Sequence, residues 1–216
     1  MKQTMFAKGY RLLYREPVRC MALFLVGHLL VFRLLEQLSR PVHRIGCRLD
    51  EYLPFCSGAI WPYLGWCLWV PGMLFWLLAK DRSRFCRGFA VLVAGDVFTL
   101  AVYAVWPTGL TLRSPVPGTG LSAALVRLLY QMDTPTNVCP SLHVFLTVAL
   151  LCAAWQQLPR WGRWLQGLTG LAICLSTVLL DQHSVLDVLA GGLLAVMLWQ
   201  LSGLRLRRRA LVRRTA

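Results

Sequence analysis

Charged residues are scarce in this chain of 216 residues. Only 15% of the residues are charged, nine of them are Asp or Glu, and 57% of the chain is hydrophobic. A soluble domain of this size needs more charge to cover its surface, and the mean hydropathy of +0.56 agrees. The composition therefore excludes an ordinary soluble domain and predicts a single membrane domain over residues 1–216.

Cysteine pairs of the CxxC type are missing as well, although the chain has eight cysteines. Without such pairs a cysteine-based metal site is not expected. Five cysteines lie in or beside apolar runs, where we interpret them as small packing residues: Cys20, Cys67, Cys86, Cys152 and Cys174. Cys47 and Cys56 share one loop, so a disulfide between them stays open if that loop faces an oxidising compartment.

The formal net charge is +14, which in a soluble protein would suggest nucleic acid as a partner. The basic residues here lie between apolar runs, and no basic amphipathic domain of the kind that grips phosphate backbones is evident. We therefore expect no nucleic acid and interpret the charge as a topological signal.

Six apolar runs are long enough, or nearly so, to cross a bilayer as helices, which takes about 20 residues each. The predicted fold is thus an all-α, polytopic membrane bundle with about six transmembrane helices. The expected spans are Cys20–Leu35, Gly58–Ala79, Gly88–Trp106, Ser141–Leu158, Trp164–Leu180 and Val185–Ser202. Between the third and fourth spans, residues 121–132 show helical periodicity that suits a helix lying on the membrane surface.

The distribution of Lys and Arg predicts the orientation of the bundle. Six spans place both termini on one side, and that side carries 17 of these residues against five on the other. The positive-inside rule then places both termini in the cytoplasm. We expect the plasma membrane, or the inner membrane of a bacterium, with membrane lipids as the surroundings.

Three polar clusters fall on the predicted outer side. They are Arg113 after the third span, Ser141 with His143 at the start of the fourth, and His183 with Asp187 where the chain enters the sixth. Ionisable groups at the ends of spans are costly and mark function by default. We therefore expect these five residues to form one site.

The residue types in these clusters suit phosphoryl transfer. His183 and Asp187 are four residues apart and would share one helix face, so that the carboxylate orients the imidazole as a nucleophile. His143 would act as general acid toward the leaving oxygen. Arg113 offers a fork of donors for phosphate, and Ser141 with the helix N-terminus offers further donors.

These motifs resemble those of the type-2 phosphatidate phosphatase and vanadium haloperoxidase superfamily, whose patterns are KxxxxxxRP, PSGH and SRxxxxxHxxxD. The second motif reads PSLH at residues 140–143, and the third reads STVLLDQHSVLD at residues 176–187. The resemblance covers residues 88–192 as a catalytic core. It implies a lipid-phosphate phosphatase without cofactor or metal, in which His183 becomes phosphorylated, Asp187 orients it, His143 protonates the leaving group, and Arg113 and Ser141 bind phosphate.

The sequence departs from the family pattern at four places. Trp106 replaces the Lys of the first motif, Ser114 separates Arg113 from its proline, Leu142 replaces the Gly of PSGH, and Thr177 replaces the Arg of the third motif. The PSLH form is similar to the branch of inositol phosphorylceramide synthases. It implies an alternative in which a lipid phosphotransferase moves the phospho-headgroup to an alcohol.

Other interpretations stay open. The loss of two cations also fits a non-catalytic membrane scaffold, and a zinc site formed by the two histidines and Asp187 is conceivable from ligand type alone. In mid-span, Asp96 must pair or face a cavity: it pairs with His28 or Arg33, or it flanks the substrate path. We interpret His28 and His43 as structural residues, and Asp133 and Asn137 as turn or cap residues.

Overall fold

The protein is mostly helical in the computed structural model, which describes residues 2–38, 43–113 and 115–215. The predicted all-α class is confirmed; Ser114, which separates Arg113 from its proline, lies outside the described residues. The α-helices are α1 (Lys2–Arg15), α2 (Pro17–Leu38), α3 (Ile60–Lys80), α4 (Arg82–Val105), α5 (Leu121–Met132), α6 (Leu142–Ala154), α7 (Arg160–Leu179) and α8 (Val185–Thr215). Two 3-10 turns, η1 (Arg48–Tyr52) and η2 (Ser57–Ala59), and two short strands, β1 (His43–Arg44) and β2 (Thr108–Gly109), complete the described fold.

Four helical segments in the described part of the chain are long and apolar enough to cross a membrane: Pro17–Leu38, Ser57–Lys80, Arg82–Val105 and Val185–Leu204. They indicate a membrane protein and match the first, second, third and sixth predicted spans. The fourth predicted span corresponds to α6, which has only 13 residues. The fifth corresponds to α7, which is not among the four and carries Arg160, Arg163 and Gln166 in its first half. The expected count of six spans is therefore not established.

Local sequence signals explain where several helices begin. The break between α1 and α2 falls at Glu16, and Pro17 takes the first position of α2, where its missing N–H costs nothing. The break between α3 and α4 falls at Asp81, whose Oδ1 accepts a hydrogen bond from the N–H of Arg84 at 2.9 Å. This N-cap satisfies one of the unpaired amides of the first turn of α4.

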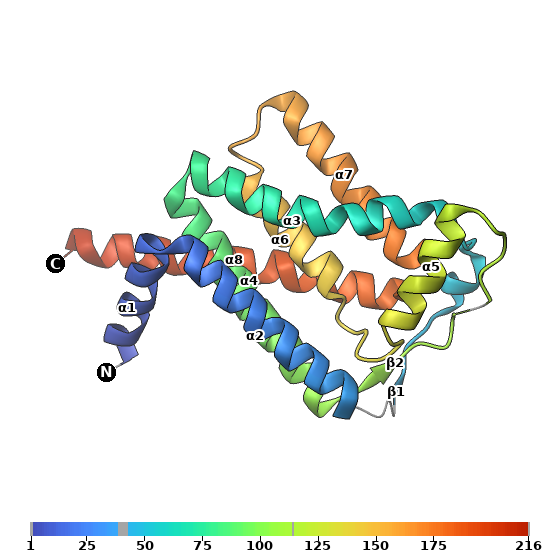
Figure 1. Ribbon diagram of the computed structural model, residues 1–216. Coiled ribbons are helices and arrows are strands. Elements are labelled where there is room, and N and C mark those ends of the chain that lie inside the picture. Colours follow the sequence, from blue (N-terminus) through green and yellow to red (C-terminus); the bar gives the residue numbers. More distant parts are fainter. Residues whose placement is uncertain (1, 39–42, 114, 216) are drawn as a thin grey trace.

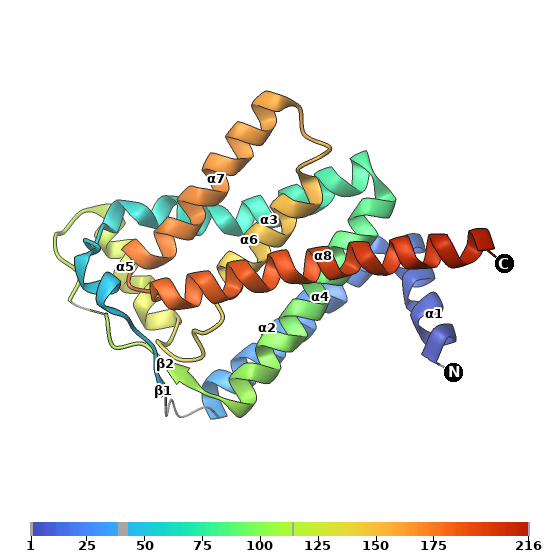
Figure 2. The same cartoon turned by 180° about the vertical axis from the view of Figure 1, so that it is seen from behind.

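The two chain termini lie at one end of the molecule, and α5 with β1 and β2 lies at the other (Figure 1). The view from behind shows the same arrangement, with α8 running from the end near α5 toward the C-terminus (Figure 2). β1 pairs in parallel with β2, which joins the loop after α2 to the loop after α4. The end that holds α5 and the strands, called the loop end below, gathers the segments that carry the predicted site.

Helix α6 lies in the centre of the bundle and packs against α3, α4, α7 and α8. It is apolar on all sides and mostly buried, as expected of a helix with neighbours all around it. Glycines let two of these neighbours approach closely. A Cβ at Gly95 of α4 would overlap the Phe145 ring, and one at Gly191 of α8 would overlap the carbonyl oxygen of Ser141.

Candidate active site

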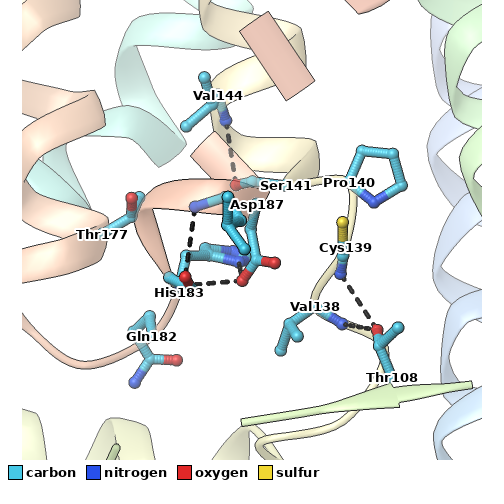
Figure 3. A network of polar contacts seen from close by, with 12 residues as sticks. Thr108, Val138, Cys139, Pro140, Ser141, Val144, Thr177, Gln182, His183 and Asp187 are labelled. Atoms are coloured by element: carbon cyan, nitrogen blue, oxygen red, sulfur yellow. Dashed lines mark hydrogen bonds and ion pairs between the residues drawn. The ribbon is translucent and has the colours of Figure 1, made fainter. Parts of the chain in front are cut away.

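The three predicted clusters meet at the loop end of the bundle. His143 lies in the first turn of α6, and His183 lies in the turn between α7 and α8. The centroids of the two imidazole rings are 6.2 Å apart. Figure 3 shows His183 and Asp187 beside Ser141, with Gln182 on the same turn as His183 and Thr177 at the end of α7. The structure thus brings both predicted histidines to one place, one from α6 and the other from the turn between α7 and α8.

His183 and Asp187 form the pair that their spacing predicts. The distance from His183 Nδ1 to Asp187 Oδ2 is 3.4 Å, within the range of an ion pair but without hydrogen-bond geometry. Both residues are buried. The local conformation differs from the prediction, because α8 begins only at Val185, so His183 precedes the helix. Proximity comes from the turn, which folds His183 back over the first turn of α8.

Hydrogen bonds between Ser184 and Asp187 cap the start of α8 and shape this turn. The N–H of Ser184 donates to Asp187 Oδ2 at 2.9 Å, and the N–H of Asp187 donates to the carbonyl oxygen of Ser184 at 3.0 Å. The N–H of Leu186 donates to Ser184 Oγ at 3.2 Å. Such reciprocal bonds satisfy amides that the helix leaves unpaired. Asp187 is therefore held by the helix start while it faces His183.

Ser141 is fully buried between α6 and α8. Its N–H donates to the carbonyl oxygen of Asp187 at 3.1 Å, and its Oγ accepts from the N–H of Val144 at 3.4 Å as the N-cap of α6. Its hydroxyl therefore serves the helix start, and the backbone bond to Asp187 fixes the distance between the two histidine-bearing segments. Phosphate contact by Ser141 stays a prediction.

Two residues that the sequence analysis did not single out hold the loop before α6. Tyr103 Oη donates to the carbonyl oxygen of Pro140 at 2.6 Å. Thr108 Oγ1 accepts from the N–H groups of Val138 and Cys139 at 3.1 and 3.2 Å, as Figure 3 shows. These backbone groups belong to the PSLH motif and to the two residues before it, so α4 and β2 set where α6 begins. No local pattern in the sequence predicts these contacts.

Arg113 reaches the turn that carries His183. Its Nη2 donates to Gln182 Oε1 at 2.6 Å, its Nη1 donates to the carbonyl oxygen of Asp133 at 2.5 Å, and Nη2 lies 3.6 Å from Asp133 Oδ2. The guanidinium also lies over the Tyr130 ring, 4.7 Å from its centroid. Gln182 is the neighbour of His183, so the predicted phosphate-binding cation is tied directly to the turn of the predicted nucleophile.

Burial governs the electrostatics of Arg113 and Asp133. Burial lowers the pKa of Arg113, and the Asp133 carboxylate opposes that shift. Burial likewise raises the pKa of Asp133, with Arg113 and His183 opposing it. Each group thus stabilises the charge of the other against desolvation. We expected Asp133 to be a turn or cap residue; it is the C-cap of α5 and is also an ionic partner of Arg113.

Aromatic side chains of α3 hold His143 in place. The Tyr63 ring stacks on the imidazole with centroids 4.7 Å apart, and the Trp66 ring lies 4.2 Å away. Tyr63 and Trp66 are three residues apart and share one face of α3. The spacing in WPYLGW could have suggested a common partner, although not which one.

Trp106 and Thr177, which replace the two cations of the family pattern, make contacts that involve no cation. Trp106 is partly exposed, and its ring lies 5.3 Å from that of His43. Thr177 is buried, and its carbonyl oxygen accepts from the N–H groups of Gln182 and His183 at 3.0 and 3.1 Å. Thr177 therefore supports the turn by its backbone and brings no charge to the site.

The remaining predicted residues lie elsewhere. The partner of Asp96 is His28, at 2.8 Å between Oδ1 and Nδ1, whereas Arg33 pairs with Glu36. Cys47 and Cys56 are both free thiols. Within the described ranges, no group of three or more His, Cys, Asp or Glu side chains is arranged to hold a metal ion.

Asn137 is buried with a positive φ of 57°, a backbone conformation that Asn tolerates well. Its N–H donates to the carbonyl oxygen of Thr108 at 2.7 Å. Asn137 thus belongs to the loop that leads into α6, in agreement with the turn role expected for it.

Comparisons with family models, with curated proteins and with solved structures found no match to this chain.

Proposed function

We propose that this protein is a membrane lipid-phosphate phosphatase that works through a phosphohistidine at the loop end of the bundle. The observation that carries the proposal is the pair of imidazoles from α6 and from the turn before α8, with ring centroids 6.2 Å apart and a buried carboxylate beside His183. This separation lets one phosphoryl group reach both rings. Similarity of the PSLH and STVLLDQHSVLD motifs to the type-2 phosphatidate phosphatase superfamily supports the same chemistry.

The first chemical step forms a phosphorus–nitrogen bond and breaks a phosphorus–oxygen bond. His183 attacks the phosphorus through Nε2, because Nδ1 faces Asp187, whose charge stabilises the positive imidazole that results. His143 gives its proton to the departing lipid oxygen. Arg113 and the amides at the start of α6 stabilise the negative charge on the phosphoryl oxygens.

The second step returns the enzyme to its starting state. His143, now neutral, takes a proton from a water molecule, whose oxygen attacks the phosphorus while the bond to His183 breaks. The products are inorganic phosphate and the regenerated pair of imidazoles. A lipid alcohol in place of water would give the phosphotransferase reaction by the same route.

Six crossings of the membrane are part of this proposal. The six helices α2, α3, α4, α6, α7 and α8 correspond to the six predicted spans, and four of them contain segments long and apolar enough to cross. The charge bias places the termini in the cytoplasm, and the site lies at the end opposite the termini (Figure 1). The substrate would thus be a lipid of the outer leaflet with a phosphate or diphosphate head.

The decisive experiment measures phosphate release by the purified protein from a panel of lipid monophosphates and polyprenyl diphosphates, with and without alcohol acceptors. We expect free phosphate without any acceptor. Product that forms only with an acceptor would replace the phosphatase by the phosphotransferase. If neither free phosphate nor a transfer product forms from any substrate, the protein is a non-catalytic scaffold and not an enzyme.

A further inference from the structure

A carboxylate far from the motifs lies against the start of α8. Asp50, in the loop between α2 and α3, is only 8% exposed. Its Oδ1 accepts from the N–H of Val185 at 2.8 Å, and its Oδ2 accepts from Ser184 Oγ at 2.7 Å and from the N–H of Cys47 at 2.7 Å. Asp50 thus links Ser184 and Val185, which are 134 and 135 positions away in the sequence, to its own 3-10 turn.

The hydrogen bonds of Asp50 complement those of Asp187. Ser184 follows His183 directly, and two carboxylates hold it from different directions. Asp187 accepts from its N–H, while Asp50 accepts from its O–H. Without Asp50, the hydroxyl of Ser184 and the amide of Val185 would lose their acceptor in a buried place, which is costly.

The charge of Asp50 suits this position. Burial acts to raise its pKa, but the hydrogen bonds from Val185, Cys47 and Ser184 outweigh burial and lower the pKa below the ordinary value. A negative charge at a helix N-terminus is also stabilised by the aligned peptide dipoles. The carboxylate is therefore ionised and firmly bound where the chain leaves His183.

We infer that Asp50 is a positioning residue for His183, holding the Ser184–Val185 backbone so that the imidazole faces Asp187 and the phosphoryl group. The inference rests on the proposed function. Asp50 reaches the imidazole only through Ser184 and Asp187, so it is not a catalytic residue. Catalytic groups must be held within a fraction of an ångström of their reactive geometry. A loosened turn would therefore slow phosphorylation of His183 while leaving substrate affinity nearly intact.

The test compares Asp50→Asn with Glu51→Gln, which removes the neighbouring, exposed carboxylate. An amide keeps one acceptor oxygen and turns an NH2 group toward donors, so the clamp is broken with little change in volume. We expect Asp50→Asn to lower kcat and the rate of phosphoenzyme formation on the order of tenfold, with KM within about twofold. Glu51→Gln should match the wild type. Equal behaviour of the two variants would overturn the inference.

A double variant distinguishes a clamp from two independent effects. Ser184→Ala removes the hydroxyl that donates a hydrogen bond to Asp50. Because this variant keeps Asp50, it also tests the contact if Asp50→Asn fails to fold. If Asp50 and Ser184 act through one contact, kcat of the Asp50→Asn, Ser184→Ala double variant should be close to that of the less active single variant. Fully multiplicative losses would contradict the clamp.

Amide hydrogen exchange makes the result independent of the chemistry. The N–H groups of Ser184 and Val185 should exchange faster in Asp50→Asn than in Glu51→Gln, in the absence of any substrate. Unchanged exchange would overturn the clamp whatever the activity. A wild-type protein that forms no phosphoenzyme would instead reject the proposed function, and with it the role of Asp50 in positioning a nucleophile, even if exchange were faster.

Discussion

The guanidinium of Arg113 is the most constrained cation of the candidate site. It donates to Gln182 and to the backbone of Asp133 through different nitrogens, and it lies over the Tyr130 ring. Arg is suited to such a place, because its planar fork holds several acceptors at once. Since Trp106 and Thr177 replace the other cations of the family pattern, Arg113 should carry an unusually large share of the charge stabilisation.

Arg113→Lys tests this share. Lysine keeps the charge but cannot donate to Gln182 and Asp133 in the same geometry. We expect kcat/KM to fall at least about tenfold, or about 1.4 kcal/mol, in steady-state assays on the best lipid phosphate. Arg44→Lys, at an exposed arginine of β1, is the matched control. If the Arg113→Lys variant were as fast as this control, Arg113 would have only a topological or solvation role.

The two histidines should respond differently to the leaving group. His183 lies beside Asp187, whereas His143 belongs to α6, stacks on Tyr63 and contacts the tilted ring of Trp66. His183→Ala should abolish activity on every substrate and prevent phosphoenzyme formation. His143→Ala should fail on alkyl esters yet recover partly on an aryl phosphate, whose leaving group needs little protonation. Rapid-quench trapping of acid-labile phosphoenzyme, with rates on both ester types, measures this.

The opposite pattern would reverse the roles. If His143→Ala loses the phosphoenzyme on both ester types while His183→Ala retains it, His143 is the nucleophile. His43→Ala, which changes a histidine packed on Trp106, should behave as the wild type. Full activity in both site variants would place the chemistry elsewhere.

At the scale of elements, the close packing of α6 on α8 decides the geometry of the site. Ser141, which begins α6, donates to the backbone of Asp187, and Gly191 one turn further along α8 lies under the Ser141 carbonyl. The two helix starts thus lie in contact through backbone atoms. Because backbone cannot move aside as a flexible side chain can, a Cβ at Gly191 would force the two helix starts apart.

Gly191→Ala and Gly192→Ala form a matched pair. The first places a Cβ into the Ser141 carbonyl oxygen, and the second meets only Val144 Cγ1 at 3.9 Å. We expect Gly191→Ala to cost about 1–3 kcal/mol of unfolding free energy by overpacking, and to lower activity by moving His143 away from His183. Gly192→Ala should be neutral or slightly stabilising. Thermal unfolding in detergent measures the difference, and equal melting temperatures would show that α6 and α8 can separate freely.

At the scale of the molecule, the helices place both termini opposite the candidate site (Figure 1). This arrangement agrees with a topology in which the site faces outward and the basic residues stay in the cytoplasm. The described residues establish four candidate spans, so the orientation calls for a direct measurement.

Single-cysteine labelling on a cysteine-free background tests the orientation. The labelling site is the exposed Thr119, in the loop before α5 at the loop end. A membrane-impermeant maleimide should label Thr119→Cys in intact cells. It should label Ser83→Cys, in the first turn of α4 and far from the loop end, only after permeabilisation. The reverse pattern would place the site in the cytoplasm.

Much of the helical order could be predicted from the sequence, because it depends on local properties. Apolar runs located six helices, and helical periodicity correctly predicted α5 over residues 121–132. The four-residue spacing brought His183 and Asp187 together as expected, although through a capping turn and not along a helix face. The need of a mid-span carboxylate for a partner suggested His28 or Arg33 for Asp96, and packing selected His28.

The tertiary structure alone decided which distant residues support these groups. Asp50 lies 134 positions from Ser184 in the turn that it holds, and Tyr63 and Trp66 reach His143 from another helix. Short-range periodicity records which face of a helix is apolar, but it carries no information on which neighbour that face meets. Such contacts exist only after the helices pack, when a buried acceptor must meet a donor and a glycine must meet a backbone. The sequence by itself therefore determined the helices and the chemical groups of the candidate site, and packing determined how they are held.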